Sequence, residues 1–338
     1  SELNEIQREI QEIDWEVSEA EKSGYDHFMY KEILEQSEVI ERTLSGRLEA
    51  SSDEIPIKLN EASKFEKIWI VACGTAYHAG LFGKDLFEKV LGVPVSVELA
   101  SEFRYREPIV GKNDLGIVIS QSGETMDTIA ATELLKENGS HVLALVNVVG
   151  SSLARMADSV FYLHVGPEIG VASTKAYLGM LVSQLVIAKH WDAENKLDVS
   201  FDEIAELPKL IDHTMACEGQ IKEISEKIYK KNDIYFIGRG LDYALAAEGA
   251  LKLKEISYLH AEALAAGELK HGTLALIEKG TPVIVTASQN HLLDKTTSNV
   301  QEVIARGAYV IAIGDSESEK LENISNDYVT LPDSNEIL

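Results

Sequence analysis

GIVISQSGET, at residues 116–125, is an apolar run followed at once by a polar turn that contains glycine. The residues Ile117–Ile119 are β-branched and favour a buried strand. The helical pattern of Thr125–Glu137 begins where the turn ends. A strand that passes through a short turn into a helix is the unit from which parallel α/β sheets are built.

The same alternation continues on both sides of this stretch. Short β-rich runs alternate with helical stretches such as Tyr77–Leu91, which predicts βαβ units around a buried parallel sheet. The predicted strands of this sheet are Lys67–Cys73, Val95–Leu99, Gly116–Ser120, Val142–Val148 and Phe161–Val165.

A second sheet is predicted from an internal repeat. The alternation restarts at Asp233–Gly238, after a helical bridge that begins at Phe201. Alternating apolar strands resemble one another by chance, but a nearly constant offset across four ordered segments favours a true repeat. The matching pairs, with their offsets, are Gly74 and Gly238 (164), 100–104 and 266–270 (166), 117–122 and 283–288 (166), and 142–145 and 310–313 (168).

The segment before the first strand is predicted to be helical and hydrophilic. Ile6, Ile10, Ile13 and Val17 form one apolar stripe on an otherwise charged helix. Because this segment lacks a second face to pack on, it is typical of a lid or linker. We therefore predict a helical segment at 1–60, a first α/β domain at 61–200 and a second α/β domain at 201–338.

The composition fits a globular protein with an acidic surface. The chain has 338 residues, of which 45% are hydrophobic and 26% charged, enough for two domains with real cores. Its net charge of −25 argues against binding to nucleic acid or to an anionic membrane, which both need clustered Lys and Arg. A small phosphorylated substrate stays possible, because backbone amides and hydroxyls hold a phosphate without a basic patch.

Neither export nor a metal site is indicated. Residues 1–20 are acidic, unlike a signal or transit peptide, and the apolar stretch 178–188 is too short to cross a bilayer. Cys73 and Cys217 form neither a disulfide framework nor a zinc cluster by themselves, and the histidines lack metal-binding spacing. We therefore expect a cytoplasmic protein without a bound metal.

The turn at 120–125 is the strongest candidate site. A turn between a strand and a helix presents free backbone amides at the positive end of the helix dipole, which suits a phosphate. Serine and threonine hydroxyls add donors, and Gly123 allows a close backbone approach. Plain helix capping, with Ser122 as N-cap and Thr125 in the first turn, explains the same residues equally well. The turn is neither a Walker loop nor a GxGxxG fingerprint, which argues against a nucleotide.

Two further turns are expected at the same edge of the sheet. Gly74-Thr75-Ala76 also follows a strand, and the carboxyl ends of parallel strands face one crevice. The stretch EIGVASTK, at residues 168–175, joins the last strand of the first repeat to a helix and offers its amides to that crevice. A helix-capping loop is an equally good interpretation of this stretch.

The second repeat contributes charged candidates. Glu248, Lys252 and Glu255 lie at positions i, i+4 and i+7 and therefore share one face of a helix. A solvated ion-pair ladder is the commoner reason for such spacing, and the alternative is a carboxylate beside an ammonium, poised to transfer a proton. His271 lies in a polar turn flanked by glycines and is a candidate acid or base.

Taken together, these motifs resemble the isomerase half of the glucosamine-6-phosphate synthases, also called glutamine:fructose-6-phosphate aminotransferases (isomerising). The resemblance runs from about residue 25 to the end, and several motifs are specific to this family. The motifs are YKEI (30–33), ACGT (72–75), EFRYR (102–106), SQSGET (120–125), EIGVASTKA (168–176), LKLKEISY (251–258), AEA (261–263) and AGELKHG (266–272).

The resemblance implies two tandem flavodoxin-like sugar-isomerase (SIS) domains, each with three layers and a parallel five-stranded sheet. It implies that fructose 6-phosphate is bound and that glucosamine 6-phosphate is formed, without a metal or organic cofactor. A histidine of the family reaches the active site of the neighbouring subunit, so a homodimer is implied as well.

The resemblance also implies roles for individual residues. Glu255 would move the proton between C1 and C2 of the sugar, Lys252 would assist nearby, and His271 would open the sugar ring. Val171 and Ser173 would line the sugar. The phosphate would be held by Thr75, Ser120, Gln121, Ser122 and Thr125.

The chain departs from the family pattern in two ways. Ala76 stands where family members commonly have serine, which removes one possible phosphate donor. The family's imine-forming carboxyl tail and its amino-terminal glutaminase domain lie outside this chain, so we do not expect the chain alone to hydrolyse glutamine. A non-catalytic sugar-phosphate regulator and a fructosamine-phosphate deglycase stay open as alternatives. The combination of Glu255, Lys252 and His271 with a phosphate loop argues against the regulator.

Overall fold

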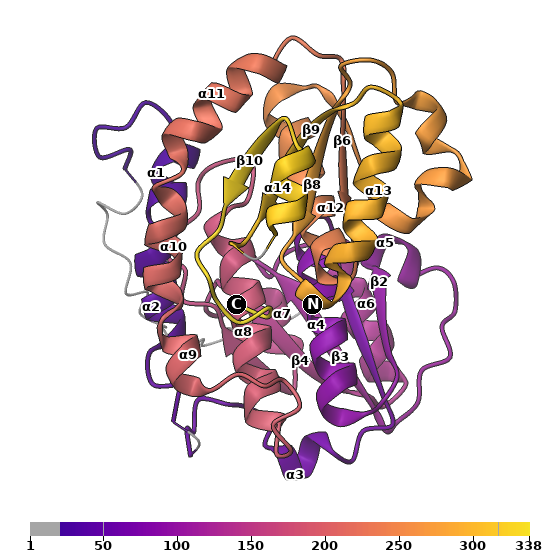
Figure 1. Ribbon diagram of the computed structural model, residues 1–338. Coiled ribbons are helices and arrows are strands. Elements are labelled where there is room, and N and C mark those ends of the chain that lie inside the picture. Colours follow the sequence, from indigo (N-terminus) through magenta and orange to yellow (C-terminus); the bar gives the residue numbers. More distant parts are fainter. Residues whose placement is uncertain (1–20, 50, 317) are drawn as a thin grey trace, which may run out of the picture.

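The computed structural model describes residues 21–49, 51–316 and 318–338, and it contains two parallel five-stranded sheets (Figure 1). The first sheet has the strand order β2-β1-β3-β4-β5. Its strands are β1 (Lys67–Ala72), β2 (Val95–Leu99), β3 (Asp114–Ser120), β4 (His141–Val146) and β5 (Ser159–Tyr162). Each lies on one of the predicted runs, with β5 shifted toward the N-terminus, so the predicted α/β class is confirmed.

The second sheet repeats the first. Read from its far edge, its order is β7-β6-β8-β9-β10, which matches the first sheet strand by strand. Its strands are β6 (Asp233–Gly238), β7 (His260–Ala265), β8 (Pro282–Ala287), β9 (Tyr309–Gly314) and β10 (Asp327–Thr330). The internal repeat predicted from the constant offset is therefore confirmed.

The strand register corrects one of the predicted repeat pairs. In the first sheet Val71 pairs with Val118, and in the second Ile237 pairs with Val285. Val71 and Ile237 are 166 residues apart, whereas Val118 and Val285 are 167 apart. The predicted match of 117–122 with 283–288 is therefore wrong by one residue. Because both strands consist of similar apolar residues, the sequence alone does not distinguish an offset of 166 residues from one of 167.

A second correction concerns Gly74, whose counterpart is Gly240 and not Gly238. Gly74 directly precedes the helix that follows β1, and Gly240 directly precedes the helix that follows β6. Their backbone angles are nearly the same, with φ 54° and ψ −129° for Gly74 and φ 57° and ψ −128° for Gly240.

Helices cover both faces of each sheet, which confirms the predicted three layers. Because successive side chains of a strand alternate, Ile70 of β1 faces one core and Val71 the other. The helices of the first repeat are α4 (Thr75–Leu91) and α8 (Lys175–Trp191) on the Ile70 face, and α5 (Ala100–Phe103), α6 (Met126–Glu137) and α7 (Ser152–Met156) on the Val71 face.

The second repeat is layered in the same way. One face of its sheet is covered by α11 (Glu218–Ile228) and α12 (Leu241–Ser257). The other face is covered by the 3₁₀ turn η2 (Ala266–His271), α13 (Leu293–Ala305) and α14 (Glu319–Ile324). The short 3₁₀ turns η3 (Thr273–Leu276) and η4 (Asn290–Leu292) follow η2 and β8.

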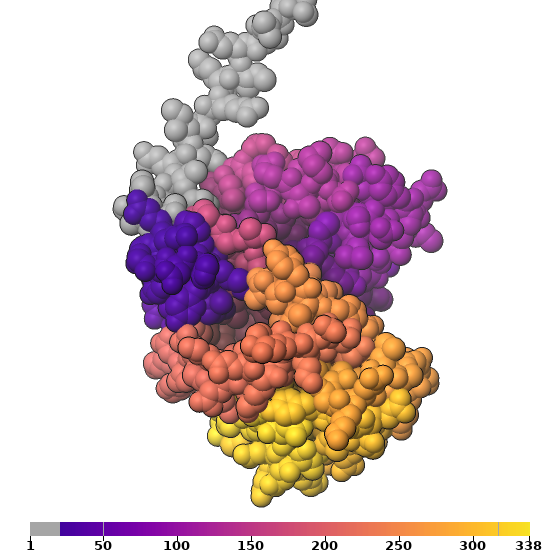
Figure 2. Space-filling model, turned by 90° about the horizontal axis from the view of Figure 1, so that it is seen from above, coloured from indigo at the N-terminus to yellow at the C-terminus, as the bar shows by residue number. Residues whose placement is uncertain are grey.

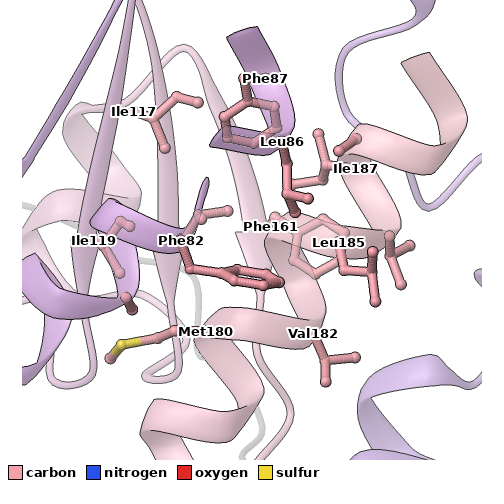
Figure 3. Close-up of a cluster of buried hydrophobic side chains, with 14 of the residues drawn as sticks. Phe82, Leu86, Phe87, Ile117, Ile119, Phe161, Met180, Val182, Leu185 and Ile187 are labelled. Atoms are coloured by element: carbon pink, nitrogen blue, oxygen red, sulfur yellow. The ribbon is translucent and has the colours of Figure 1, made fainter. Parts of the chain in front are cut away.

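A cluster of buried apolar side chains packs between the first sheet and the helices α4 and α8 (Figure 3). Phe82 and Leu86 come from α4, Met180 and Leu185 from α8, and Ile119 from β3. Burying each such side chain contributes about 1.5–3 kcal/mol. Because Ile119 and Met180 also line the candidate site, this core borders that site directly.

The segment before β1 packs on the first domain, which corrects the prediction of a lid or linker without a packing face. It contains α1 (Phe28–Leu34), α2 (Gln36–Leu44) and α3 (Leu59–Ala62). Val39, Ile40 and Leu44 of α2 are buried in the same core as α8. The predicted stripe from Ile6 to Val17 lies outside the described residues.

The predicted helical bridge consists of α9 (Phe201–Ala205), α10 (Leu207–Met215) and α11. Figure 2 shows the indigo segment with α1 and α2 beside the salmon segment that contains α10 and α11. Two hydrogen bonds join them: Tyr30 Oη donates to Glu218 Oε1 (2.7 Å), and Ser37 Oγ donates to the Pro208 carbonyl (3.1 Å). Within the described residues, no helix has the length and apolar character needed to cross a membrane.

Candidate functional site

A pocket of about 180 Å³ lies at the carboxyl edge of the first sheet. It is formed where β1 and β3 end and where α8 begins, as the strand-end rule predicts. All five residues predicted to hold the phosphate line it, together with Ser173. The lining residues are Cys73, Thr75, Ala76, Ile119, Ser120, Gln121, Ser122, Thr125, Ser173 and Met180.

The turn between β3 and α6 is held by its own hydroxyls. Ser120 Oγ accepts a hydrogen bond from the Gly123 amide (3.0 Å) and shares another with Thr125 Oγ1 (3.1 Å). Ser122 Oγ accepts from the Glu124 amide (3.2 Å). Thr125, rather than Ser122, is the N-cap of α6, and its side chain does not cap the helix. The capping interpretation with Ser122 as N-cap is therefore wrong, and the side chain of the observed N-cap, Thr125, leaves the first amides of α6 free for another partner.

Gly123 is required by the shape of this turn. Its φ is +66°, and a Cβ at this position would lie 2.1 Å from Ser151 Oγ. The turn is also tied to its neighbour on the next strand, because the Asn147 amide donates to the Gln121 carbonyl (3.1 Å). The Leu153 amide donates to the Gly123 carbonyl (3.1 Å).

Gly123→Ala is therefore expected to lower the free energy of unfolding by about 2–4 kcal/mol, from left-handed strain and overpacking together. Urea denaturation followed by circular dichroism measures the change. Gly92→Ala is the matched control, because Gly92 also has a positive φ (+69°) but has open space around its Cβ position. Equal losses of unfolding free energy in both variants would show that crowding against Ser151 does not contribute to the destabilisation.

Four amides of the stretch 168–176 are bonded to glutamate side chains, and those of Thr174 and Ala176 are capped by Glu168 at the start of α8. Glu168 accepts hydrogen bonds from Ser173 Oγ (2.8 Å) and from the amides of Thr174 (2.8 Å) and Ala176 (3.1 Å). Glu32 Oε1 accepts from the amides of Ile169 (2.6 Å) and Gly170 (3.0 Å). Helix capping by Glu168 is thus observed, and a contribution of the remaining amides to the pocket stays a prediction.

The two residues predicted to line the sugar differ in position. Ser173 lines the pocket. Val171 does not, and its side chain is fully exposed. The structure therefore brings Ser173 to the phosphate turn and leaves Val171 on the surface of the same loop.

The charged face of α12 packs against α4 and is not a solvated ladder. Glu248 is buried, and its carboxylate accepts from Thr75 Oγ1 (2.9 Å) and pairs with His78 Nδ1 (2.7 Å). Lys252 Nζ lies 3.4 Å from Glu248 Oε1 and 2.5 Å from Glu255 Oε2. It also donates to Thr75 Oγ1 (3.0 Å). The two repeats therefore meet in one connected polar network.

This network links the pocket to a possible base. Thr75 lines the pocket, Lys252 contacts Thr75, and Glu255 contacts Lys252. Of the Glu255 side-chain surface, 37% is exposed to solvent, so a substrate can reach the carboxylate. Burial raises the pKa of the Tyr177 hydroxyl, and the charge of Glu248 raises it further, so Tyr177 stays neutral beside the network.

Sequence reasoning missed the pairing of His78 with Glu248. His78 lies three residues after Thr75 on α4, so the two side chains share a helix face. That spacing was the available signal. The partner, however, lies 170 residues away on α12, and only the packing of the two repeats brings it there.

His271 lies apart from this network. It ends η2, is exposed, and its imidazole makes no hydrogen bond or ion pair to any residue that the structure describes. Its assignment as an acid or base therefore stays a prediction. In the described ranges, no group of three or more His, Cys, Asp or Glu side chains is placed to hold a metal ion.

Glu248→Ala is expected to cost about 3–5 kcal/mol of stability, because it leaves the partly buried Lys252 without its inner partner at the contact of the two repeats. Thermal and urea unfolding of the variant measure the loss. Glu226→Ala, an exposed acid on α11, is the control and should change stability by less than about 0.5 kcal/mol. A loss as small in Glu248→Ala as in the control would contradict a structural role for the network.

Comparison with known proteins adds two findings from sequence. A family model described as "SIS domain" matches residues 62–189 and 227–337. The glutamine–fructose-6-phosphate aminotransferase (isomerizing) of Clostridium tetani is 48% identical over 98% of this chain, and that of Caldanaerobacter subterraneus subsp. tengcongensis is 49% identical over 97%. The chain spans 56% of the length of each, about half of these curated relatives.

Solved structures are similar as well. The C-terminal domain of glucosamine-fructose-6-phosphate aminotransferase from Francisella tularensis is 40% identical, with a TM-score of 0.83, over 94% of this chain and 92% of that one. The tagatose-6-phosphate ketose/aldose isomerase from Escherichia coli is 20% identical, with a TM-score of 0.75, over 91% of this chain and 86% of that one. The second likeness shows a shared fold alone.

Proposed function

This chain belongs to the SIS domain family, and on that basis we propose that it is the sugar-converting half of a glutamine–fructose-6-phosphate aminotransferase. In this role it binds fructose 6-phosphate and forms glucosamine 6-phosphate, with ammonia from a glutaminase domain. The proposal is supported by relatives of that name at 48% and 49% identity and by the alignment with 92% of a solved C-terminal domain.

One observation carries the proposal: a hydroxyl-lined pocket is connected through Thr75 to the pair Lys252–Glu255. Phosphate binding alone needs only the pocket. A carboxylate held beside an ammonium adds the means to move a proton, which is the chemical step of ketose–aldose isomerisation. The pairing favours an enzyme over a sugar-phosphate regulator.

The phosphate would lie against the turn at 120–125. Ser122 and Thr125 would donate their hydroxyls, Gln121 its side-chain amide, and α6 its first backbone amides. Ser120 would mainly keep the turn in shape, since its hydroxyl already bonds Gly123 and Thr125. Thr75 donates its hydroxyl to Glu248 and would contact the phosphate through its backbone amide.

Glu255 would carry out the proton transfer. Ammonia first replaces O2 of the open ketose, and water leaves, which gives an imine at C2. The Glu255 carboxylate then takes a proton from C1; the electrons of that bond form a C1=C2 double bond, while the C2=N π pair moves to the nitrogen, which takes a proton. The same carboxylate returns its proton to C2, and O1 loses its own proton, in place of the one that the nitrogen gained, and becomes the aldehyde oxygen. The Lys252 ammonium, 2.5 Å from Glu255, would stabilise the negative charge that develops on the sugar oxygens.

His271 would open the sugar ring in the site of a second copy of the chain. His271 is exposed and lies apart from the local network. Because a group that opens the ring must contact the sugar, we place His271 at the site of another copy. We therefore propose a homodimer. A structure of the complex with fructose 6-phosphate tests this arrangement, since it would show which copy supplies the histidine.

Calorimetric titration with fructose 6-phosphate and with free fructose tests the proposed substrate class. We expect one site per chain for the phosphorylated sugar and a much weaker interaction with fructose, because most contacts go to the phosphate. Equal affinity for both sugars would contradict the proposal.

A further inference from the structure

Asp242 is a buried acid of the second repeat, and its carboxylate is held by the turn that corresponds to the phosphate turn of the first repeat. It is the second residue of α12, and only 1% of its surface is exposed. Its carboxylate accepts from the Ser288 amide (3.1 Å), from Ser288 Oγ (2.8 Å) and from Gln289 Nε2 (3.4 Å). These are a backbone amide, a hydroxyl and a side-chain amide, the same kinds of donor that line the pocket of the first repeat.

The helix that carries Asp242 is the counterpart of α4. Gly240 and Gly74 precede the two helices with nearly the same φ and ψ, so the helices leave their strands in the same direction. Asp242 and Ala76 are each the second residue of their helix. Ala76 lines the pocket, so a side chain at this position faces the turn after the third strand.

The loop that binds Asp242 is the counterpart of the phosphate turn. The strand register makes Val285 equivalent to Val118. Three residues after these valines, Ser288 is equivalent to Gln121, and four residues after them Gln289 is equivalent to Ser122. The donors that would face a phosphate in the first repeat therefore face a carboxylate of the chain itself in the second.

We propose that Asp242 is an internal substitute for the phosphate, and that the second residue of this helix decides whether a repeat can bind an external anion. The small Ala76 leaves the first repeat open, and Asp242 closes the second. The identity of the external anion rests on the function proposed above. Burial raises the pKa of Asp242, and the hydrogen bonds from Ser288 and Gln289 oppose that rise, as they would for any anion held here.

The proposal predicts that one substitution closes the first site. In Ala76→Asp the new carboxylate would accept the donors of the 120–125 turn and repel a phosphate. We expect the affinity for fructose 6-phosphate, and for inorganic phosphate as the simplest probe, to fall at least about 100-fold in calorimetry. Ala76→Asn is the matched control, because asparagine has the same size as aspartate without the charge. Its loss of affinity should be clearly smaller than that of Ala76→Asp.

The outcomes separate the two claims. If the wild-type chain does not bind fructose 6-phosphate, the proposed function fails. If the wild type binds and Ala76→Asp binds equally well, the substitution rule fails. If Ala76→Asp and Ala76→Asn lose the same affinity, space alone explains the result, and the internal anion is refuted.

A second variant keeps the test decisive should Ala76→Asp fold poorly. Asp242→Asn removes the carboxylate charge at this one position of the second repeat and changes no residue of the first repeat. Hydrogen exchange of the Ser288 amide should become at least about tenfold faster, because a charge-assisted hydrogen bond is replaced by a neutral one. Affinity for fructose 6-phosphate should stay at the wild-type value. An unchanged exchange rate at Ser288 would overturn the role of Asp242 as a bound anion.

Discussion

Replacing Glu255 by glutamine is expected to slow the formation of glucosamine 6-phosphate about a thousandfold when the protein is assayed as its full chain. Glutamine has the size of glutamate, and its carbonyl oxygen still accepts a hydrogen bond from Lys252. It cannot take a proton from C1, so the chemical step is lost. The affinity for fructose 6-phosphate should change by less than about threefold, because the phosphate contacts lie in the 120–125 turn.

Single-turnover kinetics and calorimetry on the same preparation measure these two effects separately. Glu226→Gln, the same exchange at an exposed position of α11, controls for the loss of one charge and should leave both quantities unchanged. Normal turnover in Glu255→Gln would refute the role of this residue as the base. A loss of affinity that accounts for the whole effect would assign Glu255 to binding instead.

Replacing Ser122 and Thr125 together by alanine is expected to weaken fructose 6-phosphate binding about 100-fold and to leave free fructose unaffected. Hydrogen bonds to a charged group contribute about 1.5–3 kcal/mol each, and a loss of about 2.8 kcal/mol corresponds to 100-fold in affinity. Both side chains line the pocket, and neither is needed to cap α6. The Ser120–Gly123 bond and the backbone bonds from Asn147 and Leu153 remain in the double variant, so we expect it to fold and to lose its preference for the phosphorylated sugar.

The same exchange away from the pocket provides the control. Thr214 and Ser225 lie on α10 and α11, where each hydroxyl donates to a backbone carbonyl of its own helix. Thr214→Ala with Ser225→Ala should bind fructose 6-phosphate as the wild type does. A Ser122→Ala, Thr125→Ala variant that still strongly prefers fructose 6-phosphate over fructose would contradict the phosphate assignment.

The sequence predicts the strands, their parallel arrangement and the doubled domain, because these depend on local patterns. Ile117–Ile119 is buried in β3 as its β-branched residues indicate, and the turn after it lies at the carboxyl edge of the sheet. The five candidate phosphate residues come together because two such turns follow neighbouring strands, β1 and β3. Topology alone is enough to place them.

Contacts between distant segments could not be predicted in this way. Glu248 meets His78 and Thr75 only because α12 packs against α4. The amides of Ile169 and Gly170 are bonded to Glu32, a residue of α1 that no local pattern connects to them. Helix capping also depends on backbone detail, which is why Thr125 and not Ser122 is the N-cap of α6.

A crystal structure of the protein with fructose 6-phosphate would test the central claim most directly. We predict the phosphate within hydrogen-bond distance of the Ser122 and Thr125 hydroxyls, with C1 and C2 of the sugar facing the Glu255 carboxylate. His271 of a second copy should approach the ring oxygen. A phosphate bound outside the 120–125 turn, or a sugar whose C1 and C2 face away from Glu255, would contradict the account.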